Sequence, residues 1–68
     1  MSEAFPNVYP TERLLKIDDV ADRVGLSKAT IHRLRRKKLF PSPVRTVGAR
    51  VAWKETEVMA WIAARPRA

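Results

Sequence analysis

The chain has 68 residues, a net charge of +7, one histidine and no cysteine. A chain of this length forms one small domain with a modest core and no room for a deep catalytic cleft. The lack of cysteine excludes disulfides and thiolate metal sites, and one histidine cannot hold zinc. No apolar run reaches the length of a membrane span, and the first residues lack the basic-then-apolar order of a signal peptide. We therefore expect a binding domain that is not an enzyme, with no metal, no cofactor and no membrane partner.

Positive charge is concentrated in the middle of the chain. No acidic residue lies between positions 28 and 50, a stretch that contains Lys28, Arg33, Arg35, Arg36, Lys37, Lys38, Arg45 and Arg50. A stripe of one sign repels itself unless a polyanion screens it. A solvated basic face is the simple alternative, and a membrane surface would also attract the charge, but no helix with a broad apolar face accompanies it. Nucleic acid fits best as the partner.

The chain begins with a stretch that carries no hydrophobic periodicity. Residues 1–12 contain two prolines, which predicts a flexible tail, and residues 13–68 are predicted to form the single domain. The tail also contains Phe5, Val8 and Tyr9, whose apolar side chains could dock on a partner.

Residues 17–36 have the spacing of a helix-turn-helix. The small side chain of Ala21 allows two helices to approach closely, and Gly25 supplies the positive φ that a tight corner needs. Ile31 and Leu34 lie one turn apart and are expected to seat the second helix on the first. Each feature is common alone, so the prediction rests on their joint register.

Two residues are predicted to begin these helices. A short apolar stretch at 14–17 predicts one or two strand residues, after which Asp18 is expected to be the N-cap of the first helix. Ser27 is expected to be the next N-cap, and the second helix is predicted from Lys28 to about Lys38.

The second helix is predicted to be a recognition helix. A rotation of about 100° per residue places Leu34 and Lys38 near the buried side with Ile31. The side chains predicted to face DNA are Lys28, Ala29, Thr30, His32, Arg33, Arg36 and Lys37. Each arginine could contact phosphate without reading sequence, or grip guanine with two hydrogen bonds. His32 could reach a base edge or remain in solvent.

Residues 44–53 predict a β-hairpin with a two-residue type II′ turn at Gly48 and Ala49. The expected pairs are Val47 with Arg50, Thr46 with Val51, Arg45 with Ala52 and Val44 with Trp53. That register places Val44, Val51 and Trp53 on one apolar face, and Arg45 and Arg50 together on the other. A hairpin of this kind after a recognition helix is a wing, whose arginines could enter a minor groove or hold the backbone.

A third helix is predicted over residues 54–64, with Val58, Trp61 and Ile62 on its apolar seam. Trp53 and Trp61 are expected to pack in the core rather than stack on exposed bases. The predicted fold class is therefore α+β, mainly α: a small winged helix-turn-helix with a two-stranded wing and a C-terminal helix.

The run from Leu14 to Arg65 resembles the AlpA family of phage and prophage regulators, which are small MerR-like winged-helix proteins related to excisionases. The matched segments are VADRVGLSKATIHRL, LFPSPV and GARVAWKETEVMAWIAAR. The resemblance implies a DNA-contacting segment and a basic wing, made of Ser27, Lys28, Thr30, His32 and Arg33 and of Arg45 and Arg50. Many relatives carry an aromatic residue at the position of His32, so base preference is not carried over.

The resemblance implies two functions. One is an excisionase, or recombination directionality factor, that bends attachment-site DNA for an integrase, and the other is a transcriptional regulator that acts with RNA polymerase. Either would work in the cytoplasm of a bacterial host, at its nucleoid. We expect cooperative self-association on repeated sites in double-stranded DNA, because one recognition helix buries little surface. The other classes considered are an RNA-binding or general polyanion-binding module and an adaptor that binds proteins, such as an antitoxin-like partner.

Overall fold

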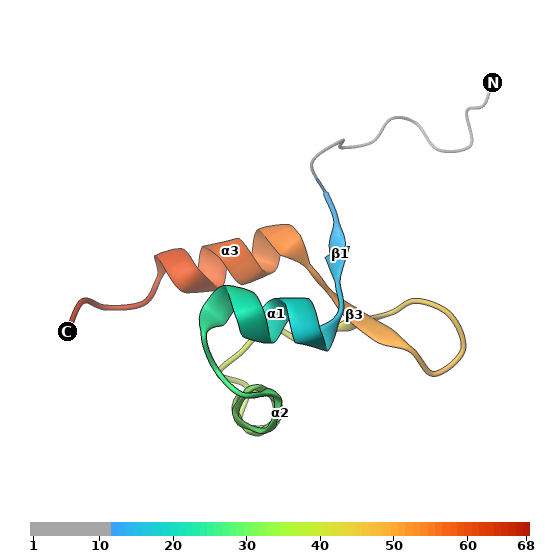
Figure 1. Cartoon of the computed structure of the whole chain (residues 1–68), viewed down its shortest axis with the longest axis horizontal. Coiled ribbons are helices and arrows are strands. Elements are labelled where there is room, and N and C mark those ends of the chain that lie inside the picture. Colours follow the sequence, from blue (N-terminus) through green and yellow to red (C-terminus); the bar gives the residue numbers. More distant parts are fainter. Residues whose placement is uncertain (1–11) are drawn as a thin grey trace.

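The computed structural model describes residues 12–68, so the predicted N-terminal tail lies outside the described residues except for Glu12. Three short helices and three strands follow one another along the chain (Figure 1). Their bounds are β1 (Leu14–Leu15), α1 (Ile17–Val24), α2 (Lys28–Arg36), β2 (Val44–Arg45), β3 (Val51–Lys54) and α3 (Glu55–Ala63). The predicted winged helix-turn-helix class, mainly helical with a small sheet, is confirmed.

The strands form one antiparallel sheet in the order β1-β3-β2. The strand residues predicted before α1 are present as β1, in which Leu15 lies opposite Trp53 and Leu14 lies opposite Lys54. The backbone amide of Glu55 also donates to the carbonyl of Arg13, at 2.8 Å. The wing is therefore attached to the first strand of the domain, because its strand β3 pairs with β1.

The corner between α1 and α2 has the predicted construction. Gly25 has φ +74° and its amide donates to the Ala21 carbonyl at 2.9 Å, which closes α1 with a left-handed residue. Ser27 is the N-cap of α2, and its side chain accepts a hydrogen bond from the Thr30 amide at 3.1 Å. The prediction for Asp18 was wrong. Helix α1 begins two residues earlier, at Ile17 after Lys16, without a side-chain cap, so Asp18 lies inside the first turn.

Helix α2 ends earlier than predicted. Its last residue is Arg36, and Lys38 adopts a left-handed conformation with φ +61°. The Leu39 amide donates to the Leu34 carbonyl at 2.9 Å, and the Lys38 amide donates to the Arg35 carbonyl at 2.9 Å. These two bonds form a Schellman motif, in which lysine takes the position that glycine usually occupies. Lys38 is consequently exposed, and its predicted place on the buried face of α2 was wrong.

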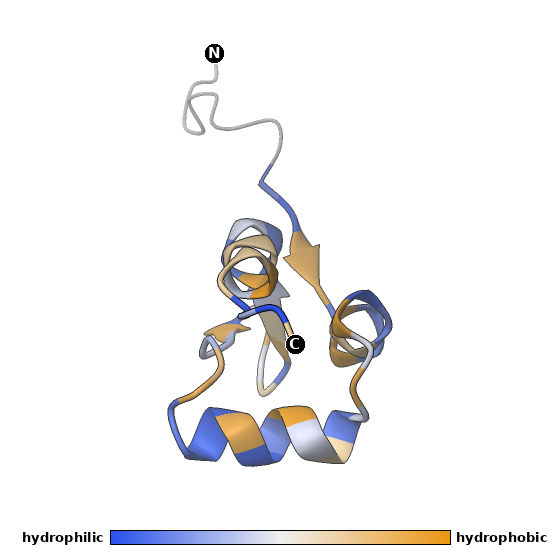
Figure 2. Ribbon diagram, turned by 90° about the vertical axis from the view of Figure 1, so that its left-hand side faces the viewer, coloured by the Kyte–Doolittle hydropathy of each residue, from blue (hydrophilic) through white to orange (hydrophobic). Residues whose placement is uncertain are grey.

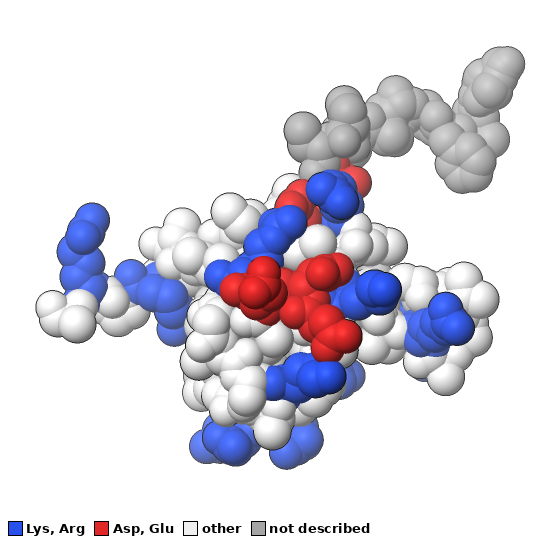
Figure 3. Space-filling view, viewed as in Figure 1, with Lys and Arg blue, Asp and Glu red and all other residues white. Residues whose placement is uncertain are grey.

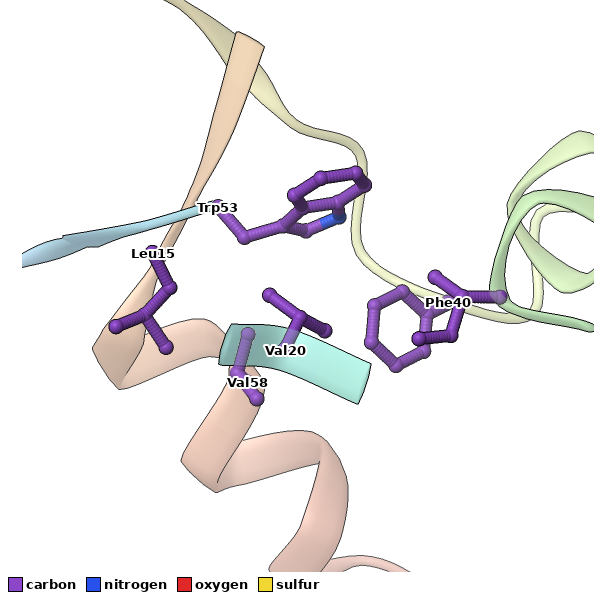
Figure 4. Close-up of a cluster of buried hydrophobic side chains, with 6 residues drawn as sticks. Leu15, Val20, Phe40, Trp53 and Val58 are labelled. Atoms are coloured by element: carbon purple, nitrogen blue, oxygen red, sulfur yellow. The ribbon is translucent and has the colours of Figure 1, made fainter. Parts of the chain in front are cut away.

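The core lies where the three helices meet the sheet. Its fully buried side chains are Trp53, Ile31, Val20 and Val58, and Leu15 and Phe40 complete it (Figure 4). Ala21 and Leu34 pack against this cluster and are partly buried, as the helix-turn-helix spacing predicted, and Leu26 packs against it too. Each core element thus contributes one or two large side chains.

The register of the wing differs from the prediction by one residue. The turn itself is close to expectation, because Gly48 has φ +59° and the Arg50 amide donates to the Val47 carbonyl at 2.9 Å. The Thr46 amide also donates to the Arg50 carbonyl at 2.9 Å, so both Thr46 and Val47 lie opposite Arg50. This extra residue is a β-bulge, and it shifts every pair beyond it.

The bulge changes which side chains share a face. Val44 now pairs with Ala52, and Arg45 pairs with Val51. Val44 has therefore left the predicted face of Val51 and Trp53, whereas Val51 keeps its side of β3 but is 41% exposed there. Arg45 shares its face with Val51 rather than with Arg50, which corrects the predicted arginine pair.

Candidate nucleic-acid interface

Helix α2 presents its cationic side away from the rest of the molecule. In Figure 2 it lies along the bottom edge, with the sheet and the other helices above it. Ile31 is fully buried beneath the helix, whereas Ala29, Arg33 and Arg36 are exposed. At about 100° per residue these three side chains fall within an arc of about 60°. Ala29 lies between Arg33 and Arg36 on this face, and its small side chain allows a binding partner to approach the helix backbone closely.

The first turn of α2 carries a linked pair of hydroxyl groups. The Ser27 hydroxyl donates to the Thr30 hydroxyl oxygen at 2.9 Å while it accepts from the Thr30 amide at 3.1 Å. Ser27 is exposed and Thr30 is half-buried. The Thr30 hydroxyl keeps its own proton free to donate, so the cap fixes a hydrogen-bond donor at the end of the helix that reaches a groove first.

Lys28 is held by an acid of the first helix. Its ammonium lies 2.8 Å from a carboxylate oxygen of Asp18, although both side chains are largely exposed. The hydrogen bond and the positive charge of Lys28 lower the pKa of Asp18 below its ordinary value of 3.8. A phosphate would have to compete with Asp18 for this lysine. Exposed pairs of this kind are weak, so Asp18 reduces the contact of Lys28 with phosphate without excluding it.

His32 lies at the flank of α2 beside the core. Its ring centroid is 6.3 Å from that of Trp53, with an angle of 53° between the planes. The side chain is half-buried rather than free in solvent. His32 thus rests on the largest core residue and is restricted in how far it can swing toward a partner.

The wing carries the second group of cations. Arg45 and Arg50 are both exposed, and Val47 at the tip of the hairpin is 74% exposed. Figure 3 shows basic side chains at the bottom of the molecule over α2 and at its right over the wing. Acidic side chains occupy the centre of the same view, over α1 and the start of α3. Basic side chains also lie at the left and in the upper part of this view, so they surround a central cluster of acids.

Two indole hydrogen bonds fix the chain that leaves α2. Trp53 donates from Nε1 to the Pro41 carbonyl at 2.8 Å, and Trp61 donates from Nε1 to the Leu39 carbonyl at 2.9 Å. Phe40 lies between these positions and packs edge-on to Trp61, with ring centroids 4.8 Å apart. Both tryptophans therefore serve the core, and they also hold the end of the basic helix in place.

The structure brings most of the predicted site residues to the exposed side of α2, and two of them lie on the separate wing. The predicted set was Ser27, Lys28, Ala29, Thr30, His32, Arg33, Arg36, Lys37, Arg45 and Arg50; all of them are exposed except the half-buried Thr30 and His32. Within residues 12–68, Lys28 is the one cation of this set that forms an ion pair. Arg35 and Lys38 are exposed too and were not predicted. Their place in the basic run was the available signal; Arg35 reaches solvent from the edge of the buried face, and Lys38 lies in the left-handed turn after α2.

Other chemistry is not assembled in the described part of the chain. Residues 12–68 contain no group of three His, Cys, Asp or Glu side chains that could hold a metal ion. Among these same residues, no helix has the length and apolar character needed to cross a bilayer.

Comparison with known proteins identifies relatives of this chain by sequence. Residues 13–66 match the model of a family described as prophage CP4-57 regulatory protein (AlpA). The chain is also similar to the uncharacterized protein ORF88 of Enterobacteria phage P4, with 46% identity over 54 residues. The alignment covers 79% of this chain and 61% of ORF88, so the chain spans less than two thirds of that relative. No solved structure matches.

Proposed function

We propose that this chain, which belongs to the AlpA family of prophage regulatory proteins, binds double-stranded DNA in a sequence-specific manner and is not an enzyme. One observation carries the proposal: the exposed side of α2 is cationic from Lys28 to Lys37, in a helix-turn-helix whose cap and corner are intact. An α-helix fits the major groove, and arginines on its outer side can reach both guanine edges and phosphates.

In this proposal the residues have different roles. Arg33 and Arg36 lie at the centre of the exposed arc and read bases or hold the flanking phosphates. Thr30 and His32 offer shorter hydrogen-bonding groups near the start of the helix. The wing arginines hold the backbone or enter a neighbouring minor groove, where negative potential is concentrated. Ser27 acts through the cap, which orients the first amides of α2 toward phosphate.

The effect of binding is proposed to be excision. An excisionase bends attachment-site DNA so that an integrase removes the element rather than inserts it. One short helix and one short wing cover little DNA, so we propose several copies that bind cooperatively to repeated sites. A titration in which a single protomer saturates the whole natural site would remove the cooperative part of the proposal.

Transcriptional regulation is the second candidate, in which the bound protein acts on RNA polymerase. The description of the family as regulatory proteins favours it. Footprinting on the DNA of the element distinguishes the two roles. Protected repeats beside an integrase attachment site support excision, and protected repeats over a promoter support regulation.

The nature of the partner is tested by salt and by strand form. If six to eight phosphates are neutralised, log K should fall against log salt with a slope of about −5 to −7. A nearly flat dependence would contradict the electrostatic part of the proposal. Equal affinity for single strands and duplex would point instead to a general polyanion-binding module, and a stable complex with a protein in the absence of DNA would point to an adaptor.

A further inference from the structure

A groove lies between α3 and the segment that follows α2, apart from the basic side of α2. It has a volume of about 450 Å³, and its apolar lining consists of Leu39, Phe40, Pro41, Ala60 and Trp61. Leu39 is 58% exposed, and Trp61 is only half-buried although its ring is among the largest apolar surfaces of the chain. The groove therefore leaves apolar area in contact with water.

Helix α3 extends this apolar area beyond the groove. Val58 on its inner side is fully buried, yet Met59 on the outside is 49% exposed, and Ala60 and Ala63 are exposed as well. The exposed polar side chains of α3 are confined to its first turn, at Thr56 and Glu57, so the rest of its outer side is apolar. Within residues 12–68, no segment covers the outer side of α3, so its occupant is to be sought elsewhere.

The chain enters the described region beside this helix. The Thr56 hydroxyl, in the first turn of α3, donates to the carboxylate of Glu12 at 3.1 Å. Thr56 and Ala60 are four residues apart and therefore neighbours on one side of the helix. Ala60, which lines the groove, therefore lies one helical turn from Thr56, the residue that binds Glu12 where residues 1–11 join the domain.

The length and composition of residues 1–11 match this path. Tyr9 is three residues before Glu12, a reach of about 10 Å in an extended chain, and Trp61 lies about 7.5 Å along the helix axis from Thr56. Phe5 is seven residues before Glu12, so it can reach the Leu39 side of the groove. The one charged side chain in this segment is Glu3. The rim of the groove carries Lys38 and Arg65 against the single acid Glu57, so an acidic side chain is matched to it.

We propose that residues 1–11 of the same chain occupy the groove, with Tyr9 and Phe5 against Trp61 and Leu39 and with Glu3 beside the basic rim. The segment covers the apolar side of α3 that the rest of the fold leaves in water. This inference is independent of DNA binding, because none of the predicted DNA-contact residues lines the groove.

The chain contains no cysteine, which permits a direct test. The variant S2C carries a nitroxide label in ¹⁵N-enriched full-length protein, and loss of amide signal is mapped at low protein concentration. We expect selective loss at Leu39, Ala60 and Trp61, and recovery of those signals when F5S and Y9S are added. The pair N7S and T11S, polar exchanges in the same segment, is the matched control and should leave the pattern unchanged.

Several outcomes of this experiment would contradict the proposal. Uniform or absent signal loss would overturn the proposal, as would loss centred on α2. A mixture of labelled ¹⁴N protein with unlabelled ¹⁵N protein distinguishes the source of the occupant. If the groove signals are lost only in that mixture, a second copy fills the groove and the proposal of the same chain is wrong.

Discussion

The indole nitrogen of Trp61 lies 2.9 Å from the carbonyl oxygen of Leu39, so the last helix is tied to the segment that ends the basic helix. Trp53 makes the equivalent bond to Pro41 at 2.8 Å. Two donors from different elements thus hold two carbonyls of one three-residue segment. These two bonds hold the segment that follows α2, and the burial of Ile31 holds the helix itself against the core.

Removing the Trp61 donor gives the first prediction. W61F keeps an aromatic ring against Phe40 but loses the hydrogen bond, and we expect a loss of about 1 kcal/mol in the free energy of unfolding. W53F should cost more, about 2 kcal/mol or above, because it also leaves space in a fully buried site. Urea unfolding followed by circular dichroism measures both. A W61F protein as stable as the wild type, or a reversed order, would contradict the role given to these bonds.

The left-handed residue at the end of α2 gives the second prediction. Lys38 has φ +61°, a conformation that costs L-residues about 1–2 kcal/mol and glycine almost nothing. Since glycine also has more freedom in the unfolded chain, we expect K38G to raise the free energy of unfolding by a net amount of about 0.5–1 kcal/mol. K38A removes the same charge but keeps the Cβ atom, so it should not be stabilised. Equal effects from the two substitutions would mean that charge, not backbone conformation, determines the change.

The Asp18–Lys28 pair gives a prediction about acid stability. The folded protein lowers the pKa of Asp18, so the unfolded chain binds its proton more readily. The resulting stabilisation is fully present above the unfolded value of 3.8 and is lost as the pH falls through the folded value. The difference in unfolding free energy between wild type and D18N should therefore be constant near neutrality and shrink below about pH 4. A difference that grows in acid would reverse the assigned sign.

The same pair gives a prediction about binding. D18N frees Lys28 at neutral pH, so we expect tighter binding to duplex DNA and a log K against log salt slope that is steeper by about 0.9, the value for one more neutralised phosphate. D22N removes an equal charge from α1 without touching Lys28 and is the matched control. If D22N increases the affinity and the salt slope as much as D18N does, the gain reflects net charge alone.

The central arginines of α2 give the last prediction. R33A and R36A should each weaken binding and make the salt slope shallower by about 0.9 for each phosphate that is no longer neutralised. A residue that reads a base should lose about 1–3 kcal/mol on the specific site and much less on scrambled DNA. R67A, in the exposed chain after α3, is the control for charge. Unchanged affinity in both α2 variants would remove the proposed interface.

The parts of the fold predicted correctly are those that a few neighbouring residues determine. Gly25 is the left-handed corner because its lack of a side chain allows that conformation, and Ser27 caps α2 because its hydroxyl reaches an amide three residues on. The burial of Ile31 follows from the same local spacing. Each of these features depends on nearby residues and on one or two local hydrogen bonds, so it could be predicted from the sequence.

The predictions that were wrong concern features that a contact with a residue distant in the sequence determines. Asp18 is a good cap by type, but the strand that pairs Leu15 with Trp53 leaves only Lys16 before the helix, which begins at Ile17, two residues earlier than predicted. The bulge at Thr46 determines which residues of β2 and β3 pair. No residue type in the hairpin predicted it. The position of His32 beside Trp53 was not predicted, because a helical wheel does not show a tryptophan from another element.

The placement of β3 between its two neighbours affects how the protein behaves at high concentration. Its four residues form the longest strand, with β1 on one edge and β2 on the other. The outer edges that remain belong to strands of only two residues each, and one of them contains Arg45. Short and charged edges are poor templates for the addition of another chain. A small protein with an apolar central strand is thereby protected from edge-to-edge aggregation.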